Sequence, residues 1–284
     1  MHLKATASRA ATLLARNPSL FCRLMIAKIN TARRMPPLPV SRTINNIVFE
    51  YDLEDYRGTA PMYFGSYALL VIDAMKRVLK SGDVFFDVGA NVGYLSAIAA
   101  GIVGSRGEVH AFEPVPEYFR RLQRLAQRNS SYRIVPIESA AGETAGNCKI
   151  YVTREPGQNT LVPAYKSGPE IVDVLQVRVI RLDEYIEANR IRRIALIKID
   201  AEGYELPVLR GLERHFAKQG NRPPIICEIA PRAYPLMGRK ISELTEYLGQ
   251  FGYSARDLVD GVTPVDLGAV EHVEDVLFVS EATA

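Results

Sequence analysis

The residues best placed to do chemistry are carboxylates that follow apolar segments. Asp87 begins the segment Asp-Val-Gly-Ala-Asn-Val-Gly, residues 87–93, which links two apolar stretches. Gly89 and Gly93 can turn tightly and leave the backbone open to a ligand. The pattern predicts a strand, a binding turn and a helix, although an ordinary glycine-rich turn has the same appearance.

A second carboxylate, Glu113, follows the apolar stretch at 109–112 and lies 20 residues after Gly93. An acid at this position can accept hydrogen bonds from the two hydroxyls of a ribose, so we expect an adenosine-containing ligand. The turn carries Asn91 where a dinucleotide motif requires its second glycine, which disfavours a pyrophosphate. Asp87 would also repel a phosphate, yet attract the amino group or the sulfonium of S-adenosylmethionine.

A third acidic group follows another apolar stretch, in the sequence Leu-Ile-Lys-Ile-Asp-Ala-Glu-Gly-Tyr-Glu. Lys198 and Asp200 share one face of the predicted strand, and Glu202 and Glu205 are expected to share one face of a following helix. Glu228, at the end of a further apolar stretch, could join the same cleft. These charges either form a structural network, in which Lys198 neutralises an acid, or line a catalytic site.

The acids are suited to general-base chemistry. An alcohol that attacks a methyl group has to lose its proton, and a carboxylate within hydrogen-bond distance can accept it. Asp200 is the first candidate for this base or for orienting the acceptor, followed by Glu202 and then Glu228. No histidine is expected at this end of the strands, since His110 is predicted to lie in the core. The acids could alternatively bind Mg²⁺, but they lack a metal-site spacing, and no metal is predicted.

Strands and helices alternate from residue 41 onward, which predicts an α/β domain whose parallel sheet is covered by helices on both faces. Alternating residues at 149–153 and 175–180 predict an inserted hairpin, with a loop at 155–159. Ligands bind at the carboxyl ends of parallel strands, so the three acidic groups should converge there, with the turn of Ser139 and Ala140 beside the adenine. The predicted strands of the sheet, about seven, are 84–88, 109–112, 133–137, 194–199, 225–229, a stretch near Tyr253, and 276–279.

Composition excludes several classes of protein. The chain has 284 residues, of which 48% are apolar and 24% are charged, as in globular domains. Its longest apolar runs fall short of the 18 or so residues of a membrane span, and a cytoplasmic location is expected. Cys22, Cys148 and Cys227 are widely separated and form no C-x-x-C pair, so neither a disulfide framework nor a cysteine zinc site is predicted.

The N-terminal region differs in charge from the rest of the chain. Residues 1–49 carry eight Lys and Arg and no acid, which leaves 3 − 8 = −5 for the remainder. We predict a basic helical arm with a proline-rich linker at 1–40, followed by a single domain at 41–284. The arm could dock on the body, lie at a membrane surface or be a transit peptide, and docking is favoured. An acidic body gives no reason to expect a nucleic-acid partner.

The chain resembles the FkbM-type S-adenosylmethionine-dependent methyltransferases, of the class I methyltransferase superfamily, over roughly residues 60–230. This resemblance implies a Rossmann-like seven-stranded sheet with an antiparallel last strand and S-adenosylmethionine as the methyl donor. It most often implies O-methylation of a hydroxyl on a sugar or natural product. The motifs that carry it are 87–93, Glu113-Pro114, Ala140-Ala141-Gly142, 198–206 and Glu228.

The expected function is therefore an S-adenosylmethionine-dependent methyltransferase with a small-molecule or glycan acceptor. Asp87, Gly89, Asn91, Gly93, Glu113, Ser139 and Ala140 are expected to hold the donor. Segments 61–67, 158–160 and 232–234 are expected to form the acceptor pocket. One alternative is an NAD-dependent oxidoreductase, and another is a catalytically inactive module that recruits a partner through the basic arm.

Overall fold

A computed structural model describes residues 40–44, 46–51, 67–155, 157–166, 168–218 and 222–280, together with Pro18, Cys22 and Met62. The predicted basic arm lies outside these residues apart from Pro18, Cys22 and Val40, so its structure stays a prediction. None of the helices in the described ranges combines the length and the apolar character that crossing a bilayer requires.

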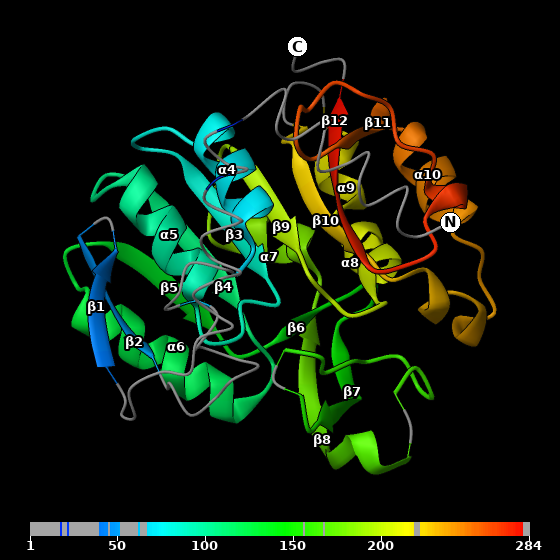
Figure 1. Cartoon of the computed structure of the whole chain (residues 1–284), viewed down its shortest axis with the longest axis horizontal. Coiled ribbons are helices and arrows are strands. Elements are labelled where there is room, and N and C mark those ends of the chain that lie inside the picture. Colours follow the sequence, from blue (N-terminus) through cyan, green and yellow to red (C-terminus); the bar gives the residue numbers. More distant parts are fainter. Residues whose placement is uncertain are drawn as a thin grey trace.

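A seven-stranded sheet forms the centre of the body (Figure 1). In spatial order its strands are β11 (Tyr253–Asp257), β12 (Glu274–Ser280), β10 (Ile225–Ile229), β9 (Leu196–Ile199), β3 (Val84–Val88), β4 (Glu108–Phe112) and β5 (Arg133–Ile137). The strands from β10 to β5 pair in parallel. The last strand, β12, is antiparallel to both of its neighbours. The predicted α/β class, with seven strands and a reversed last strand, is confirmed.

The order of the strands reverses beside β3. From β3 the chain adds β4 and β5 on one side, and it later returns to place β9 on the other side of β3. In open α/β sheets, ligands bind outside the carboxyl ends of the strands at such a switch point. The fold therefore directs a ligand to the ends of β3 and β9.

Helices cover both faces of the sheet, as predicted. Successive strand residues point to opposite faces, so Phe85 joins one hydrophobic core and Phe86 joins the other. The first core includes α4 (Leu69–Val78), α5 (Tyr94–Val103) and α6 (Pro116–Arg128). The second includes α7 (Leu182–Ala188), α8 (Glu205–Arg210), α9 (Glu213–Phe216) and α10 (Ser242–Gly249). Short 3-10 helices are η1 (Gly168–Glu170), η2 (Pro231–Ala233), η3 (Pro235–Met237) and η4 (Leu267–Ala269).

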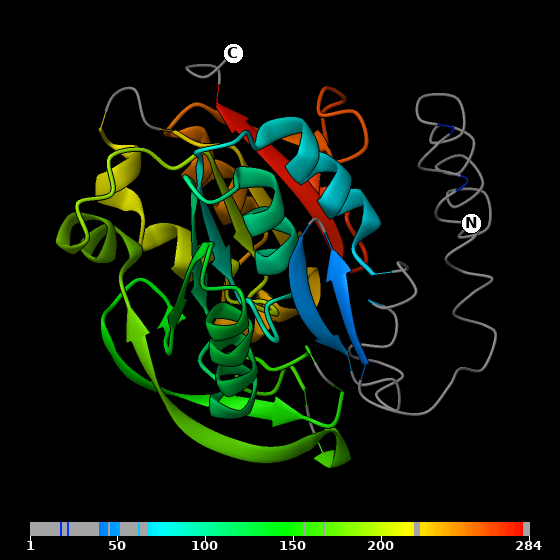
Figure 2. The same ribbon diagram turned by 90° about the vertical axis from the view of Figure 1, so that its left-hand side faces the viewer.

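A small additional sheet is inserted between β5 and β9. β7 (Gly146–Thr153) and β8 (Ile171–Ile180) are antiparallel, and β6 (Ala140–Ala141) pairs in parallel with β8. Figures 1 and 2 show this insert at one end of the main sheet. The predicted hairpin is confirmed and is longer than expected. A second hairpin, β1 (Val40–Ile44) with β2 (Ile47–Tyr51), is not predicted by the sequence pattern.

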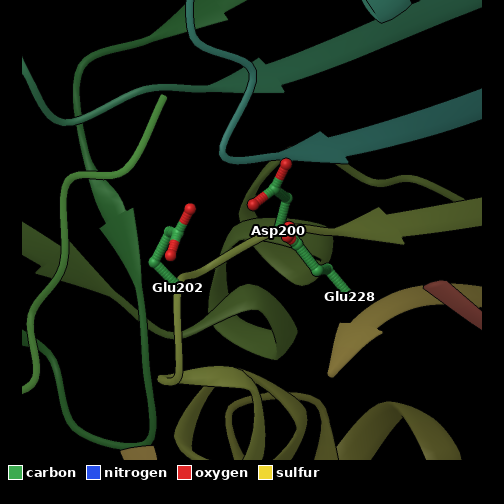
Figure 3. Close-up of side chains that lie close together, drawn as sticks. All are labelled: Asp200, Glu202 and Glu228. Carbon is green, nitrogen blue, oxygen red and sulfur yellow. The ribbon is translucent and has the colours of Figure 1, made fainter. Parts of the chain in front are cut away.

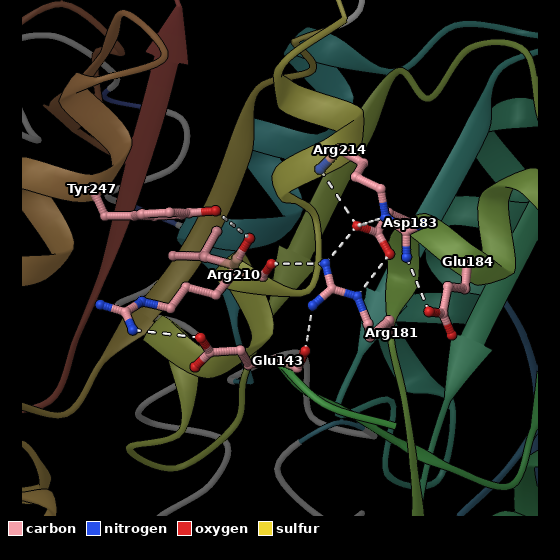
Figure 4. A network of polar contacts seen from close by, with 8 residues as sticks. Glu143, Arg181, Asp183, Glu184, Arg210, Arg214 and Tyr247 are labelled. Carbon is pink, nitrogen blue, oxygen red and sulfur yellow. Dashed lines mark hydrogen bonds and ion pairs between the residues drawn. The ribbon is translucent and has the colours of Figure 1, made fainter. Parts of the chain in front are cut away.

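A charged network joins the insert to the helices of the second core (Figure 4). Asp183 in α7, whose side chain is 3% exposed, accepts hydrogen bonds from Arg181 Nε at 3.1 Å and Nη2 at 2.7 Å. Arg214 Nε donates to the same carboxylate at 3.2 Å, and Arg181 also donates to the carbonyl oxygen of Glu143. Burial alone would raise the pKa of Asp183, but the hydrogen bonds and charges of Arg181 and Arg214 together outweigh it and lower this pKa.

Candidate functional site

A cavity lies where the sheet topology directs a ligand, at the carboxyl ends of β3, β4 and β9. Its empty space, including the open mouth, is about 660 Å³. Of the ten predicted site residues, Asp87, Gly93 and Glu228 are not among those that line it. The other seven line it, and they are Gly89, Asn91, Glu113, Ser139, Ala140, Asp200 and Glu202.

Asp87 is buried on β3, next to the turn that it begins. Its Oδ2 accepts a hydrogen bond from Ser96 Oγ at 2.6 Å, whereas its Oδ1 has no partner within the described part of the chain. Lys198 lies opposite Asp87 on the neighbouring strand β9. Burial raises the pKa of Asp87, and the Lys198 ammonium acts in the opposite direction. Asp87 therefore brings an unsatisfied carboxylate oxygen to the turn.

The two predicted glycines of the turn have structural reasons of their own. Gly89 and Gly93 have φ values of +80° and +83°, which only glycine adopts easily. A Cβ on Gly89 would lie 1.9 Å from the carbonyl oxygen of Asp200, and one on Gly93 would lie 2.6 Å from atoms of Leu122 and Leu125. Close packing of β3 on β9 and of α5 on α6 thus requires them. Gly89 lines the cavity as well, so this one glycine serves both purposes.

Glu113, at the end of β4, fixes the conformation of the turn. Its Oε2 accepts the Asn91 N–H at 2.8 Å, and its Oε1 accepts the Val115 N–H at 2.8 Å. Burial raises the pKa of Glu113 to about 7, although these two hydrogen bonds act to lower it. Each carboxylate oxygen has two lone pairs, so Glu113 can hold the turn and still accept hydrogen bonds from a ligand.

Ser139 and Ala140 lie at the edge of the cavity, after β5. The Ser139 side chain is buried, and its Oγ donates to the carbonyl oxygen of Glu138 at 2.6 Å. Apolar side chains, including Phe112 and Ile150, line the cavity with them. The structure places both predicted residues at the cavity, and their contact with an adenine stays a prediction.

Asp200 follows β9 and is paired with Lys198. Lys198 Nζ donates to Asp200 Oδ2 at 2.6 Å, with the Lys198 side chain 4% exposed and that of Asp200 20% exposed. The prediction that the two share a strand face is confirmed. Burial alone would lower the pKa of Lys198, but the carboxylates of Asp200 and Asp87 outweigh it and raise this pKa. Lys198 is thus a buried cation whose ammonium is paired with the Asp200 carboxylate.

Glu202 lies in a turn rather than in a helix. Its φ is +48°, and α8 begins only at Glu205, so the prediction that these two acids share a helix face is wrong. Thr160 Oγ1 of the insert donates to the Glu202 carbonyl oxygen at 2.7 Å and holds the turn. Burial and the nearby Asp200 raise the pKa of Glu202 to about 7, opposed by Lys166, whose Nζ lies 3.8 Å from Oε2.

Glu205 is fully buried in the second core. It accepts the Gly203 N–H at 2.6 Å and the Tyr234 hydroxyl at 3.3 Å. Burial raises the pKa of Glu205 to about 8, although these hydrogen bonds oppose the shift. Glu205 therefore supports the loop that carries Asp200 and Glu202, and it is not among the residues that line the cavity.

The carboxylates of Asp200, Glu202 and Glu228 converge, as Figure 3 shows, with oxygens within 4.8 Å of one another. Burial and the neighbouring acids, Asp200 first, raise the pKa of Glu228 well above its ordinary value. Lys198 and Lys166 supply positive charge beside Asp200 and Glu202. Asp200 already accepts a hydrogen bond from Lys198, and Glu202 forms an ion pair with Lys166. Since ammonium groups rather than a cation such as Mg²⁺ pair with these acids, we assign no metal to them.

Sequence reasoning did not identify Lys166, which has no motif around it and reaches Glu202 only through the folding of the insert. Tyr67 and Asn159, from two of the predicted acceptor segments, line the cavity. Burial and the charge of Asp200 raise the pKa of Tyr67. His110 is buried in β4, as predicted, and burial lowers its pKa.

The sheet and its cavity define a Rossmann-like α/β protein with a small-molecule site at the topological switch point. Residues 87–255 match the family model described as the methyltransferase FkbM domain. The chain therefore belongs to the FkbM methyltransferase family, which confirms the resemblance found in the sequence, and S-adenosylmethionine is the methyl donor of that family. Membership gives no support to the alternative of an NAD-dependent oxidoreductase.

Individual relatives are similar over about half of the chain. The chain is 28% identical to hexuronic acid methyltransferase AglP of Haloferax volcanii, over 50% of this chain and 55% of AglP. It is 30% identical to 31-O-demethyl-FK506 methyltransferase FkbM of Streptomyces tacrolimicus, over 48% and 61%. Less than two thirds of either relative is covered. A solved FkbM methyltransferase from Methylobacillus flagellatus aligns with 95% of this chain and 60% of its own, at 16% identity and a TM-score of 0.44.

The residues that line the cavity, together with Asp87 next to it, fit the donor of this family. Asp87 Oδ1 is a buried acceptor without a partner among the described residues, and Glu113 retains lone pairs. S-adenosylmethionine carries a net positive charge, and no Lys, Arg or His is among the described residues that line the cavity. Carboxylate acceptors and apolar walls are the groups that such a nucleoside requires.

Proposed function

We propose that the chain transfers the methyl group of S-adenosylmethionine to a hydroxyl of a sugar, a glycan or a small natural product. One observation carries the proposal: a single cavity is lined both by Glu113 with the turn that it holds and by the acids Asp200 and Glu202. The names of the relatives, a hexuronic acid methyltransferase and an FK506 methyltransferase, support acceptors of this kind. The transferase domain is proposed to be residues 41–284, with the arm outside it, and the cytoplasmic location stays a prediction.

We propose that residues at the ends of β3, β4 and β5 hold the donor. Glu113 accepts hydrogen bonds from the ribose hydroxyls, and Asp87 attracts the positively charged amino acid part. Gly89 gives the ligand access to the turn, and Ser139 and Ala140 flank the adenine ring of the donor. When bound, the donor supplies an electrophilic methyl group on a sulfonium and leaves as a thioether.

The acids beyond β9 are proposed to prepare the acceptor. General-base catalysis is most efficient when the pKa of the base is close to the working pH, and the pKa of Glu202 is raised to about 7. Asp200 is fixed in position by its hydrogen bond from Lys198, which suits it to orient the acceptor hydroxyl. We therefore place Glu202 first as the base and Asp200 as the orienting acid, with Glu228 beside them. The acceptor oxygen forms its bond to the methyl carbon, and its proton passes to Glu202.

Labelling tests this function. The protein is incubated with methyl-labelled S-adenosylmethionine and a cell extract, and the extract is fractionated for labelled products. We expect label in a small-molecule or glycan fraction, and at least about a hundredfold less of it with Glu202→Gln at equal protein concentration. A protein that binds S-adenosylhomocysteine but labels nothing in any fraction would support the inactive binding module instead.

A further inference from the structure

The charges of the cavity restrict which acceptor it can take, provided that the proposed function holds. Three of the described lining residues are carboxylates, namely Glu113, Asp200 and Glu202, and none is Lys, Arg or His. Glu228 adds a further carboxylate within 4.8 Å of Asp200 and Glu202. Glu113 lies on the donor side, so Asp200 and Glu202 are the carboxylates that line the acceptor side, and Glu228 lies next to them.

The two lysines near these acids are already bound. Lys198 Nζ donates to Asp200 Oδ2 at 2.6 Å, and its side chain is 4% exposed. Lys166 Nζ donates to Gln158 Oε1 at 3.0 Å and lies 4.8 Å from the centre of the Tyr165 ring, besides its ion pair with Glu202. Both ammonium groups therefore already have protein partners, and neither lysine is among the described residues that line the cavity. Of the other cations on this side, Arg232 is exposed in η2 and does not line the cavity.

The remaining polar groups of the lining are neutral. Tyr67 and Asn159 line the cavity, and phenol and amide groups form hydrogen bonds with hydroxyls without requiring charge. An acceptor carboxylate or phosphate would instead lie beside Asp200 and Glu202 with no cation among the described lining residues, and juxtaposed like charges discriminate against a ligand.

We propose that the ring bearing the methylated hydroxyl carries no anionic group, so that the acceptor is a neutral or amino sugar, or a similar polyol, rather than a uronic acid. This charge selection separates the chain from its relative AglP, whose name specifies a hexuronic acid. The selection arises from Asp200 and Glu202, the two carboxylates that line the acceptor side of the cavity.

Ion exchange of the labelled product tests the proposal even while the acceptor is unidentified. The product is hydrolysed with acid to its single rings, and the labelled ring is applied to an anion exchanger at pH 8. We expect at least about tenfold more label in the unretained than in the retained fraction. Label that is retained and then released by salt would overturn the proposal. Label released as methanol by mild base would also overturn it, because it would mark a methyl ester of a carboxylate.

A variant that adds a positive charge to the lining of the cavity provides a second test. Asn159→Lys should raise the retained fraction of label several-fold, whereas Asn159→Met, which removes the same amide without adding charge, should not. Calorimetry with S-adenosylhomocysteine checks that both variants keep the donor site. If neither wild type nor variants bind S-adenosylhomocysteine or transfer label, the proposed function fails and this inference falls with it. If donor binding and transfer persist but the label is anionic in the wild type, only this inference fails.

Discussion

Two clusters of acids in this protein receive very different numbers of positive partners. Around Asp183, one carboxylate accepts hydrogen bonds from both Arg181 and Arg214 (Figure 4). At the ends of β9 and β10, three carboxylates share two lysines and lie within 4.8 Å of one another (Figure 3). The pKa of Asp183 is lowered, whereas those of Glu202 and Glu228 are raised.

The difference separates a structural role from a chemical one. An acid with a full set of arginine partners stays ionised and can only hold its neighbours together. An acid with too few partners keeps a pKa near neutrality and can exchange a proton. The first cluster joins the insert to the second core, and the second borders the cavity. The sequence alone left both interpretations open for the acids after β9, and this contrast favours catalysis.

The largest expected effect is on the rate of methyl transfer, when an acid of the cluster of Asp200, Glu202 and Glu228 is changed. Glu202→Gln should lower the rate of methyl transfer by about 10²- to 10⁴-fold, because it removes the base. Its affinity for S-adenosylhomocysteine should remain close to that of wild type by calorimetry. Full activity in Glu202→Gln together with loss in Asp200→Asn would transfer the role of base to Asp200.

The corresponding change at Asp183, whose carboxylate has two arginine partners, should affect stability instead. Asp183→Asn should lower the free energy of unfolding by about 3 kcal/mol, because it leaves Arg181 without its anionic partner. Urea unfolding measures this loss, and the protein that remains folded should transfer methyl groups normally. Glu184→Gln is the matched control: its ion pair with Arg214 is exposed, so it should change stability by less than about 0.5 kcal/mol. Equal effects of the two substitutions would remove the contrast.

The donor side should respond in affinity. Glu113→Ala should weaken S-adenosylhomocysteine binding by about 1.5–3 kcal/mol, the contribution of a charge-assisted hydrogen bond. Glu113 also holds the Asn91 N–H, so Glu113→Gln, which keeps an acceptor for one amide, should lose less. Unchanged affinity in both variants would show that Glu113 only shapes the turn.

Per pH unit, the smallest effect is a dependence of stability on pH. The pKa of Glu205 is raised from 4.5 to about 8, so the folded state holds a proton that the unfolded state loses above pH 4.5. Its contribution to stability is complete below pH 4.5 and is lost as the pH rises to about 8, with a slope of at most about 1.4 kcal/mol per pH unit.

Glu205→Gln should therefore flatten the fall in unfolding free energy between pH 5 and 8. The pKa of Asp183 is lowered, so its contribution has the opposite sign and is lost only as the pH falls below its ordinary value of about 3.8. Denaturant titrations at several pH values measure both limbs. An unchanged slope in Glu205→Gln would assign the pH dependence to other groups.

Much of the fold follows from local sequence signals. Apolar strands that end in Asp87, Glu113 and Asp200 were sufficient to predict the parallel sheet and the cavity at its edge. Strand limits were less accurate, since β9 begins at Leu196 rather than at residue 194. The hairpin of β1 and β2 was missed because its residues lie beside a basic, proline-rich segment that masks the strand pattern.

The details of the site depend on contacts between distant segments. Glu202 has a positive φ, and Thr160 of the insert donates a hydrogen bond to its carbonyl oxygen; no propensity of the local sequence indicates either feature. Lys166 reaches Glu202 from 36 residues upstream, which a linear motif cannot show. Sequence reasoning therefore located Asp200, Glu202 and Glu228 but could not determine which lysine pairs with which acid.

The most direct test is a crystal structure of the protein grown with S-adenosylhomocysteine. We predict the nucleoside in the cavity, with its ribose hydroxyls on Glu113 and its sulfur turned toward Asp200 and Glu202. A cavity that stays empty at a ligand concentration that saturates other methyltransferases, or a nucleoside bound elsewhere on the surface, would contradict the account.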